Sequence, residues 1–393
     1  MIVGVPRETY PGGCQVAVVP DAVPGLVKAG LEVLVEQGAG EAAGYPDRAY
    51  RDKGAALAVS RDEVFSRADI VLQYQAFGAN PQGDADLERV RQGQAVIAFL
   101  EPLSNAGAAG RLAGTGAAAF SMELMPRITR AQSMDALSSM ATVSGYKAVL
   151  LAAGHLPRMF PMMMTAAGTA TPARVFVVGA GVAGLQAIAT SRRLGAVVQA
   201  YDVRPAVKEQ VESLGSKFLE LELEAGEAED SGGYAREMNE EFLRRQREMM
   251  ARAVADSDVV ITTAAVPGKK APVLVTAGMV ENMRTGSVVV DLAAERGGNC
   301  ELTKPGETVL EHGVSIIGPV NLPSTVPYHS SQMYSRNVTT FLLHLIKEGQ
   351  LVIDTEDEIT RETLVAAGGE VVHPRVREIL GLAPKTAGQG GSD

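Results

Sequence analysis

The stretch Arg174-Val-Phe-Val-Val-Gly-Ala-Gly-Val-Ala-Gly184 decides the fold of this 393-residue chain. Its four consecutive apolar residues, 175–178, are typical of a short strand that is buried on both faces. Glycines follow at the spacing of a dinucleotide-binding loop. Gly179 allows a tight turn, Gly181 lets the backbone approach a pyrophosphate, and Gly184 lets the next helix pack close to the strand. The stretch therefore predicts the first strand, loop and helix of a nucleotide-binding sheet.

The sequence beyond the glycines continues this pattern. A helix follows, with Val182, Leu185 and Ile188 on one face, and a second strand over 197–201 ends before Asp202. A carboxylate at this place accepts hydrogen bonds from an adenosine ribose diol and repels a 2′-phosphate. We therefore expect the site to prefer NAD(H) over NADP(H). The alternative is that Asp202 only caps a turn.

Length and composition predict a globular protein of two or three domains, because 46% of the 393 residues are hydrophobic. A net charge of −10 and a pI of about 5.2 argue against binding to nucleic acid or to an anionic lipid surface. Cys14 and Cys300 have no disulfide or metal-ligand spacing, so we expect free thiols in a reducing compartment and no metal site. We expect no signal peptide and no apolar run long enough to span a bilayer.

Apolar runs alternate with helical patterns before the glycine-rich stretch, which predicts a parallel sheet with helices on both faces. The capping pattern of Ser60 and Glu63 marks one of these helices. This domain has no glycine fingerprint of its own. The expected strands cover 2–5, 32–35, 70–72, 95–99 and 117–120.

The second sheet is expected to contain six parallel strands, counted from Val175. The strands after the first two cover 218–223, 259–262, 288–291 and 314–317. An acidic, glycine-containing segment over 224–233 predicts a solvated, mobile loop before a charged helix at about 237–255.

Two helices connect these domains in the sequence. The first covers about 136–156 and begins after Asp135 as a plausible N-cap, and Met162–Met164 after it are interpreted as adaptable core packing. The second, 331–348, has no strand partner in the second sheet, so we expect it to return to the first domain.

The fold class predicted is therefore α/β, with two doubly wound parallel-sheet (Rossmann-like) domains and a cleft between them. The predicted domains are 1–135 plus 328–382 for the discontinuous first domain, 136–327 for the NAD(H)-binding domain, and 383–393 for a flexible tail.

A dehydrogenase that oxidises an alcohol or an amine needs a general acid or base beside the nicotinamide. The five histidines are poor candidates, and only His329 lies near a plausible cleft. A polar cluster of Arg127, Arg130, Gln132, Asp135 and Ser138 stands out instead. From the residues alone, this cluster is also consistent with a solvated loop in which Asp135 caps the following helix.

Three runs give the chain a family resemblance. They are Phe120-Ser-Met-Glu-Leu-Met-Pro-Arg-Ile-Thr-Arg-Ala-Gln-Ser-Met-Asp135, Met162-Met-Met-Thr-Ala-Ala-Gly-Thr169 and Asp291-Leu-Ala-Ala-Glu-Arg-Gly-Gly-Asn299. They closely resemble the NAD(H)-binding component (domain I, alpha-1 subunit) of proton-translocating NAD(P) transhydrogenase, and the resemblance covers nearly the whole chain.

This resemblance implies roles for the polar cluster. Arg127, Asp135 and Ser138 are expected to hold the dihydronicotinamide of NAD(H), and Gln132 is expected to reach toward NADP(H) on a partner. The catalytic residues implied are Gln132, Arg127 and Asp135, and Tyr234 is the residue expected to close a mobile loop over the nucleotide. The cofactor-binding residues that we expect in all are Arg127, Asp135, Ser138, Gly179, Ala180, Gly181, Val182, Gly184, Asp202, Val203, Arg204, Tyr234, Thr263, Ala264, Gly268 and Leu292.

Alanine dehydrogenase, to which this family is related, is the rival interpretation. It uses an Arg for the carboxylate of pyruvate, a Lys and a His, and the corresponding places here hold Gln15, Gln75 and Glu101. These residues remove the charge or the proton-transfer group that oxo-acid chemistry requires, so amino-acid oxidation is disfavoured. A non-catalytic NAD(H)-sensing module remains a third alternative.

The resemblance also implies how the enzyme works and where it lies. Hydride passes directly between NADH and NADP bound on a partner subunit, so catalysis consists of positioning and exclusion of water. The implied partners are a second copy in a homodimer and the NADP(H)-binding and membrane-spanning subunits, without direct membrane insertion of this chain. The implied location is cytoplasmic, at the inner face of the plasma membrane through those partners.

Overall fold

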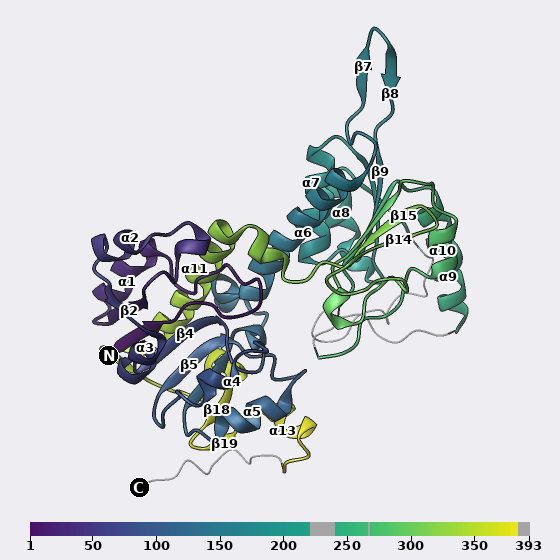
Figure 1. Cartoon of the computed structure of the whole chain (residues 1–393). Helices are drawn as coiled ribbons and strands as arrows, with labels where there is room; N and C mark the ends of the chain where they lie inside the picture. Colours follow the sequence, from purple (N-terminus) through teal and green to yellow (C-terminus); the bar gives the residue numbers. More distant parts are fainter. Residues whose placement is uncertain (221–239, 266–267, 384–393) are drawn as a thin grey trace. The chain divides into compact units, whose positions relative to one another are not determined.

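The computed structural model describes residues 1–220, 240–265 and 268–383. The chain divides into two compact units: one contains Met1–Met140 and the chain from Pro323 onward, and the other is Ala141–Leu322 (Figure 1). Our predicted boundaries, after residues 135 and 327, differ from these by a few residues and stay a prediction, as does the expected cleft. The expected loop at 224–233, Tyr234 and the tail beyond 383 lie outside the described residues.

The sheet of the second unit follows the doubly wound order. It runs β11-β10-β9-β12-β13-β15-β14, so its parallel strands stand in the order third, second, first, fourth, fifth, sixth. The predicted number of six parallel strands is confirmed, and β14 adds an antiparallel edge that we did not predict. The strand expected over 218–223 is shorter in the described residues, where only residues 217 and 218 are in strand and 221–223 are not described. The strands are β9 Arg174–Val178, β10 Val197–Tyr201, β11 Lys217–Phe218, β12 Val259–Thr262, β13 Val288–Asp291, β14 Thr308–Glu311 and β15 Val314–Ile317.

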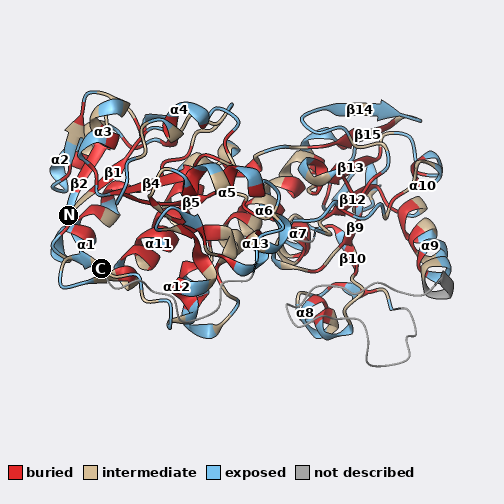
Figure 2. Ribbon diagram, turned by 90° about the horizontal axis from the view of Figure 1, so that it is seen from below, coloured by how far each residue is buried: buried red, intermediate tan, exposed pale blue. Residues whose placement is uncertain are grey.

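Helices cover both faces of this sheet because alternate side chains of its strands point in opposite directions. From β9, Val175 and Val177 pack in one cluster with Ile188 of α7, whereas Phe176 packs in another with Val254 of α9. Figure 2 shows the buried strands between helices whose outer faces are exposed. The helices are α7 Val182–Arg193, α8 Lys208–Ser213, α9 Glu240–Ala255 and α10 Ala277–Glu281.

The parallel strands of the first unit have the same order as those of the second unit, but different antiparallel strands are added at the edge of the sheet. Its sheet runs β19-β18-β6-β5-β4-β1-β2-β3, and the six strands β1 to β6 are parallel. β18 and β19 add an antiparallel edge. The strands predicted from the sequence are present, and β3, β18 and β19 are additional. The bounds are β1 Ile2–Val5, β2 Glu32–Glu36, β3 Ala56–Ala58, β4 Ile70–Gln75, β5 Ala95–Phe99, β6 Ala118–Ser121, β18 Leu364–Ala367 and β19 Glu370–Val371. The fold class of two doubly wound α/β units is therefore confirmed.

Helix α11, Pro327–Leu345, packs in the core of the first unit although it follows the second sheet in the sequence. Tyr334, Val338 and Phe341 are fully buried there, and the rings of Phe341 and Phe120 meet at 69° with centroids 5.7 Å apart. The other helices of this unit are α1 Val23–Lys28, α2 Asp47–Asp52, α3 Arg61–Arg67, α4 Asp84–Leu87, α5 Ala106–Ala113, α12 Glu358–Thr363 and α13 Pro374–Ile379.

Two elements differ from the sequence expectations. Helix α6, Ala136–His155, is the one described helix that reaches the length and hydropathy of a membrane span, so our expectation of no such run is wrong by that criterion. Core helices of soluble proteins meet the same criterion. The hairpin of β7, Met163–Thr165, and β8, Gly168–Ala170, projects from the second unit (Figure 1). Its methionines are exposed, Met164 by 74%, so the interpretation of Met162–Met164 as core packing is wrong.

Candidate functional site

The glycine-rich loop lies between β9 and α7, and its three glycines meet different surroundings. Gly179 has φ +95°, and a Cβ there would lie 2.5 Å from Thr263 Oγ1. A Cβ on Gly184 would lie 1.9 Å from the carbonyl oxygen of Gly179, so the helix packs against the loop without a side chain between them. A Cβ on Gly181 would meet nothing within 4 Å. The open side at Gly181 fits a pyrophosphate on the loop, at the N-terminus of a helix.

Two of the three apolar residues that the pattern placed on one face of α7 pack against the sheet: Ile188 is fully buried and Leu185 packs against the same cluster. Val182 is 43% exposed, so its place on that packing face is wrong. Gly184 and Ala187 are also buried in this helix. The small residues permit close packing on the sheet, and Val182 is left beside the open loop.

Asp202 follows β10, and its carboxylate contacts both the glycine-rich loop and Arg204. Oδ2 accepts a hydrogen bond from Ala180 N at 2.7 Å, and Oδ1 accepts one from Arg204 N at 2.9 Å. The guanidinium of Arg204 adds contacts of 2.9 Å to each oxygen, from Nε to Oδ1 and from Nη2 to Oδ2. Burial raises the pKa of Asp202, but these contacts outweigh burial and hold the pKa below its usual value. Asp202 thus caps its own turn, which was the alternative considered for it.

The loop after β12 is held by Asn299. Asn299 is fully buried, and its Oδ1 accepts a hydrogen bond from Ala264 N at 2.9 Å. Its Nδ2 donates to the carbonyl oxygens of Ala264 and Pro272, both at 2.8 Å. Thr263, beside Ala264, donates through Oγ1 to the carbonyl oxygen of Gly179 at 3.1 Å. The loop after β12 is therefore tied directly to the loop after β9.

Asp291, the last residue of β13, holds Asn299 in turn. Its fully buried carboxylate accepts hydrogen bonds from Thr262 Oγ1, Ala293 N, Asn299 N, Cys300 N and Thr303 Oγ1, at 2.7–3.0 Å. A buried carboxylate needs such donors because it has lost its water. The sequence marked Asp291 and Asn299 only as the ends of a family run, and their roles were missed. Asn299 bonds to Ala264 and Pro272, 35 and 27 residues away, so no local pattern could have shown its role. Most of the donors to Asp291 lie within twelve residues of it, but they come from an irregular loop that the sequence pattern does not predict.

The predicted cofactor-binding residues of the second unit collect at one edge of the sheet, where the parallel strands β9, β10, β12 and β13 have their carboxyl ends. Ligands of doubly wound sheets bind at this edge. Ala180 is buried, whereas Val203 and Leu292 are half-buried and Gly268 is exposed with φ +73°. Tyr234 lies outside the described residues.

The polar cluster predicted in the first unit lies on a short 3₁₀ segment, Thr129–Met134, and on the start of α6. Arg127 and Gln132 are exposed, and Asp135 and Ser138 are half-buried. Asp135 Oδ1 accepts a hydrogen bond from Ser138 N at 2.9 Å, and Oδ2 accepts one from Ser138 Oγ at 2.5 Å. Asp135 therefore caps α6, as the simpler interpretation expected, while Gln132 presents its amide to the outside.

Buried side chains and two polar contacts hold this cluster in the first unit. The side chains of Ala131 and Met134 are buried in the core. Arg130 Nη1 lies 2.8 Å from Asp357 Oδ1, and Asn337 Nδ2 donates to the carbonyl oxygen of Ser133 at 2.9 Å. The loop is consequently rigidly held although its polar side chains are exposed. Neither Asp357 nor Asn337 was predicted, because both come from the far end of the chain.

Asp357 is fixed by further contacts in the same unit. Its Oδ2 accepts hydrogen bonds from Thr360 N and from the ring of His344, each at 2.9 Å. Burial raises the pKa of Asp357, but these donors and Arg130 lower the pKa well below its usual range. Asp357 is therefore ionised at neutral pH and attracts Arg130.

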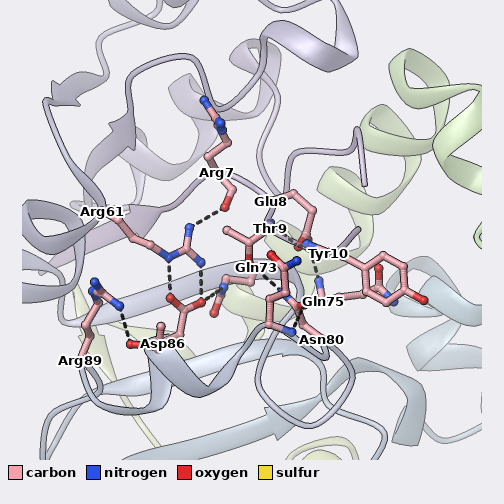
Figure 3. Close-up of polar contacts among 12 residues, drawn as sticks. Arg7, Glu8, Thr9, Tyr10, Arg61, Gln73, Gln75, Asn80, Asp86 and Arg89 are labelled. Atoms are coloured by element: carbon pink, nitrogen blue, oxygen red, sulfur yellow. Dashed lines mark hydrogen bonds and ion pairs between the residues drawn. The ribbon is translucent and has the colours of Figure 1, made fainter. Parts of the chain in front are cut away.

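The three positions that we matched to the charged and proton-transfer groups of the rival enzyme hold uncharged or acidic side chains, and the match itself stays a prediction. Gln15 is 1% exposed, and its Oε1 accepts hydrogen bonds from Ser324 Oγ at 2.5 Å and from Cys14 N at 3.2 Å. Glu101 has φ +50°, and its carboxylate accepts a hydrogen bond from Ser104 Oγ at 3.0 Å. The backbone amide of Gln75 donates to Glu8 Oε2 at 3.0 Å (Figure 3). These three residues are tied into the first unit by hydrogen bonds and supply no cation.

The polar network of Figure 3 has a structural explanation. Arg61 Nε lies 2.5 Å from Asp86 Oδ1, and its Nη1 donates to the carbonyl oxygen of Arg7 at 2.6 Å. Gln73 Nε2 donates to Asp86 Oδ2 at 2.9 Å. Burial raises the pKa of Glu8, although hydrogen bonds from three backbone amides oppose the rise. The network fixes the chain after β1, and no metal-ligand group of three His, Cys, Asp or Glu residues occurs among the described residues.

Glu123 is a carboxyl group with limited exposure in the first unit, just before the polar cluster. Oε1 accepts hydrogen bonds from Leu100 N at 2.8 Å and from Glu101 N at 2.5 Å, and Oε2 accepts one from Ser121 Oγ. Burial, together with the nearby Glu101 carboxylate, raises the pKa of Glu123 to about 7. This group was not predicted, because its neighbours come from the end of another strand.

Comparisons with known proteins match both units. Two family models match, described as alanine dehydrogenase/PNT N-terminal domain over residues 4–144 and C-terminal domain over 148–374. A curated protein of Rhodospirillum rubrum, named as the first portion of the alpha subunit of NAD(P) transhydrogenase, is 48% identical over 377 residues, which cover 95% of this chain and 98% of that protein. A crystal structure of transhydrogenase from Sinorhizobium meliloti is 42% identical with a TM-score of 0.82, and covers 95% of this chain and 99% of its own.

A solved L-alanine dehydrogenase has nearly the same fold but a more distant sequence. Its TM-score is 0.81 at 26% identity, and the match covers 97% of this chain and 99% of that chain. The overall fold is therefore shared by both kinds of relative, whereas the sequence identity favours the transhydrogenase subunits. These matches confirm the resemblance predicted from the sequence.

Proposed function

Because this chain belongs to the alanine dehydrogenase/PNT family, we propose that it is the NAD(H)-binding subunit of a proton-translocating transhydrogenase. The reaction is NADH + NADP⁺ → NAD⁺ + NADPH. A hydride leaves C4 of the dihydronicotinamide held by this chain and bonds to C4 of the nicotinamide held by a partner subunit. The relatives that are 42–48% identical and carry the name transhydrogenase support this proposal.

Two features of the chain carry the proposal: the second unit has an intact glycine-rich loop, and the first unit lacks the charged and proton-transfer side chains that oxo-acid chemistry requires. Gln15, Gln75 and Glu101 stand where the rival enzyme has a cation or a proton-transfer group. A glutamine cannot balance the charge of an oxo-acid carboxylate, and neither glutamine titrates. Hydride transfer between two nicotinamides needs neither group, since no proton is exchanged at the reacting carbons.

The roles proposed for the second unit follow from its geometry. The backbone amides at Gly181 and Val182, at the start of α7, bind the pyrophosphate. Asp202 accepts hydrogen bonds from the adenosine ribose. The residues proposed to line the rest of the NAD(H) site are Gly179, Ala180, Gly184, Val203, Arg204, Tyr234, Thr263, Ala264, Gly268 and Leu292.

The roles proposed for the first unit concern the reacting end of the nucleotide. Arg127, Asp135 and Ser138 hold the dihydronicotinamide, and the exposed amide of Gln132 orients the NADP(H) of the partner. Catalysis then consists of bringing two C4 atoms together in a dry site, for which a rigidly held loop is suited. The anchoring of this loop through Arg130 and its buried Ala131 supports these roles.

The proposed assembly contains further subunits. The relatives are named as an alpha subunit or a portion of one, which supports the existence of partners. We propose a homodimer of this chain, bound to NADP(H)-binding and membrane-spanning subunits at the cytoplasmic face of the plasma membrane. In this assembly the present chain contributes the NAD(H) site and does not insert into the bilayer.

Reconstitution tests the proposal. The purified chain should bind NADH, and hydride should pass from NADH to an NADP analogue only after the NADP(H)-binding partner is added. Turnover of alanine and NAD⁺ without a partner would establish the dehydrogenase alternative. Binding of NADH without any transfer in the complete mixture would establish the sensing module.

A further inference from the structure

The carboxylate that should receive the adenosine ribose is already held by an arginine two residues away. Asp202 and Arg204 form a bidentate pair, with both guanidinium contacts at 2.9 Å. The side chains are only 7% and 17% exposed, so solvent screens this pair little. Asp202 also accepts hydrogen bonds from Ala180 N and Arg204 N. Each oxygen of Asp202 therefore accepts two hydrogen bonds within the chain, so a ribose hydroxyl must share an oxygen with these donors or displace one of them.

The two side chains favour different nucleotides. A carboxylate accepts from the 2′- and 3′-hydroxyls of an NAD(H) ribose and repels the 2′-phosphate of NADP(H). A guanidinium presents two parallel N–H groups, and this fork fits a phosphate as well as it fits a carboxylate. Arg204 thus has the geometry of a phosphate-binding residue, but that geometry is directed at Asp202.

We propose that Arg204 is a latent 2′-phosphate-binding residue which Asp202 keeps occupied, so that this one ion pair sets the preference of the site for NAD(H) over NADP(H). The inference rests on the proposed function, because it assigns the specificity of the same site. In the proposed enzyme each nucleotide must stay on its own subunit. A site that accepted both nucleotides would bind the product NADPH in place of NADH and stop the transfer.

The turn cap does not require the guanidinium of Arg204. The backbone amide of Arg204 alone caps the turn through Asp202 Oδ1, and any residue at 204 except proline could donate it. The guanidinium is an addition to that cap. Lys208, four residues further along the chain, is also a cation, but its Nζ pairs with Glu220 Oε2 at 2.7 Å in an exposed ion pair. Lys208 therefore serves as a matched control for the effect of positive charge as such.

Binding of NADH and NADPH to four variants tests the inference, with the affinity of each nucleotide measured by fluorescence titration. Asp202→Asn removes the charge but keeps an oxygen that accepts from Ala180 N, so the variant should stay folded. We expect NADPH to bind Asp202→Asn at least about tenfold more tightly than it binds the natural chain, because the released guanidinium forms a bidentate phosphate pair. NADH should bind about tenfold more weakly, because the ribose loses its charged acceptor.

The double variant Asp202→Asn/Arg204→Gln shows whether Arg204 is the residue that binds the 2′-phosphate of NADPH. The gain in NADPH affinity should disappear in this double variant and should persist in Asp202→Asn/Lys208→Gln. Arg204→Gln alone should leave NADPH binding as weak as in the natural chain, since Asp202 still repels the phosphate. Equal NADPH affinity in the two double variants would overturn the inference, and so would an unchanged NADPH affinity in Asp202→Asn that melts at the natural temperature.

These outcomes are distinct from failure of the proposed function. If the natural chain binds NADH and transfers hydride with its partner, but the double-variant cycle shows no coupling between Asp202 and Arg204 toward NADPH, only the specificity inference fails. If the natural chain does not bind NADH, the proposed function fails with it. A melting temperature for each variant separates loss of folding from loss of binding.

Discussion

Asn299 bonds to both backbone polar groups of Ala264: its Oδ1 accepts from Ala264 N at 2.9 Å, and its Nδ2 donates to Ala264 O at 2.8 Å. A side-chain amide suits these contacts because one planar group carries an acceptor oxygen for Ala264 N and two N–H donors for Ala264 O and Pro272 O. We call these contacts of Asn299 the clamp. They hold the loop after β12, and Thr263 in the same loop donates through Oγ1 to the carbonyl oxygen of Gly179 in the glycine-rich loop. Nucleotide binding should therefore depend on a residue that need not touch the nucleotide.

Asn299→Asp tests this clamp with little change in volume. The carboxylate cannot donate to Ala264 O or to Pro272 O, so two partly buried hydrogen bonds are lost, at a cost of about 1–3 kcal/mol in all. We expect a lower free energy of unfolding and about tenfold weaker binding of NADH. Asn282→Asp is the matched control, because Asn282 Nδ2 also donates to a backbone carbonyl, Gly278 O, but at an exposed position; it should leave NADH affinity unchanged and lower the free energy of unfolding by less than about 1 kcal/mol. Natural NADH affinity in Asn299→Asp would show that the loop does not need the clamp.

Two glycines of the fingerprint should respond differently to the same added methyl group. In Gly184→Ala the Cβ would lie 1.9 Å from the carbonyl oxygen of Gly179, so the helix must move away from the loop. We expect a loss of stability of about 2–4 kcal/mol. In Gly181→Ala the Cβ meets nothing within 4 Å, so the chain should fold as before.

The second half of this prediction concerns the ligand. If a pyrophosphate lies against Gly181, the methyl group of Gly181→Ala stands in its place, and NADH affinity should fall by about tenfold or more at an unchanged melting temperature. Melting curves and NADH titrations of the two variants check both halves. Full NADH affinity in Gly181→Ala would place the pyrophosphate elsewhere.

Much of the fold was predictable because it depends on local patterns. Val175–Val178 and Val288–Val290 are apolar runs bounded by glycines or polar residues, and such runs in alternation with helices define a parallel sheet. The edge strands were missed for a physical reason: β3 is three residues long and carries alanines, which have low strand propensity. The pair Gly368–Gly369 between β18 and β19, with positive φ at both residues, is typical of a β-hairpin turn, so this hairpin could have been predicted from the sequence.

The site was predictable to the extent that its residues lie close in sequence. The glycine spacing and Asp202 follow one motif, and Asp135 caps the helix that begins after it. The residues that position them could not be found in this way. Asp357 reaches Arg130 from a distant segment of the chain, and such a contact exists only after the fold has formed.

Gln132 is the residue on which the transfer step should depend. Gln132→Asn shortens the exposed side chain by one methylene and keeps its amide, so binding of NADH should change by less than about twofold. Hydride transfer in the reconstituted enzyme should slow by about tenfold to a hundredfold, because a displacement of about 1 Å in a positioned reaction has this effect. Ser133→Ala, at the next exposed position of the same loop, is the control. A loss of NADH affinity with transfer per bound nucleotide intact would contradict the role of Gln132.

Glu123 predicts a pH dependence of stability. Its pKa is raised from 4.5 to about 7, so between these values the folded protein keeps a proton that the unfolded chain releases. The free energy of unfolding should therefore fall as the pH rises through this window, by about 1–3 kcal/mol, and should level off above it. Glu123→Gln should lack this slope. Unfolding by urea at pH 5 and pH 8 checks the difference between the two proteins.

A second variant identifies the cause of this shift. Glu101→Gln removes the neighbouring carboxylate, which is the second contribution to the raised pKa after burial. The midpoint of the stability change should then move below 7 while the slope remains. A stability difference between the natural chain and Glu123→Gln that is constant across this range would show that Glu123 titrates normally.

The transfer of deuterium from C4 of NADH tests the central claim most directly. NADH that carries deuterium at the transferred position is mixed with this chain, its NADP(H)-binding partner and NADP⁺ in ordinary water, and the NADPH formed is examined by mass spectrometry. We predict that the product carries the deuterium at C4 without dilution by solvent hydrogen, and that no product forms if either protein is left out. Product hydrogen derived from water, or turnover without the partner, would contradict direct transfer between two bound nicotinamides.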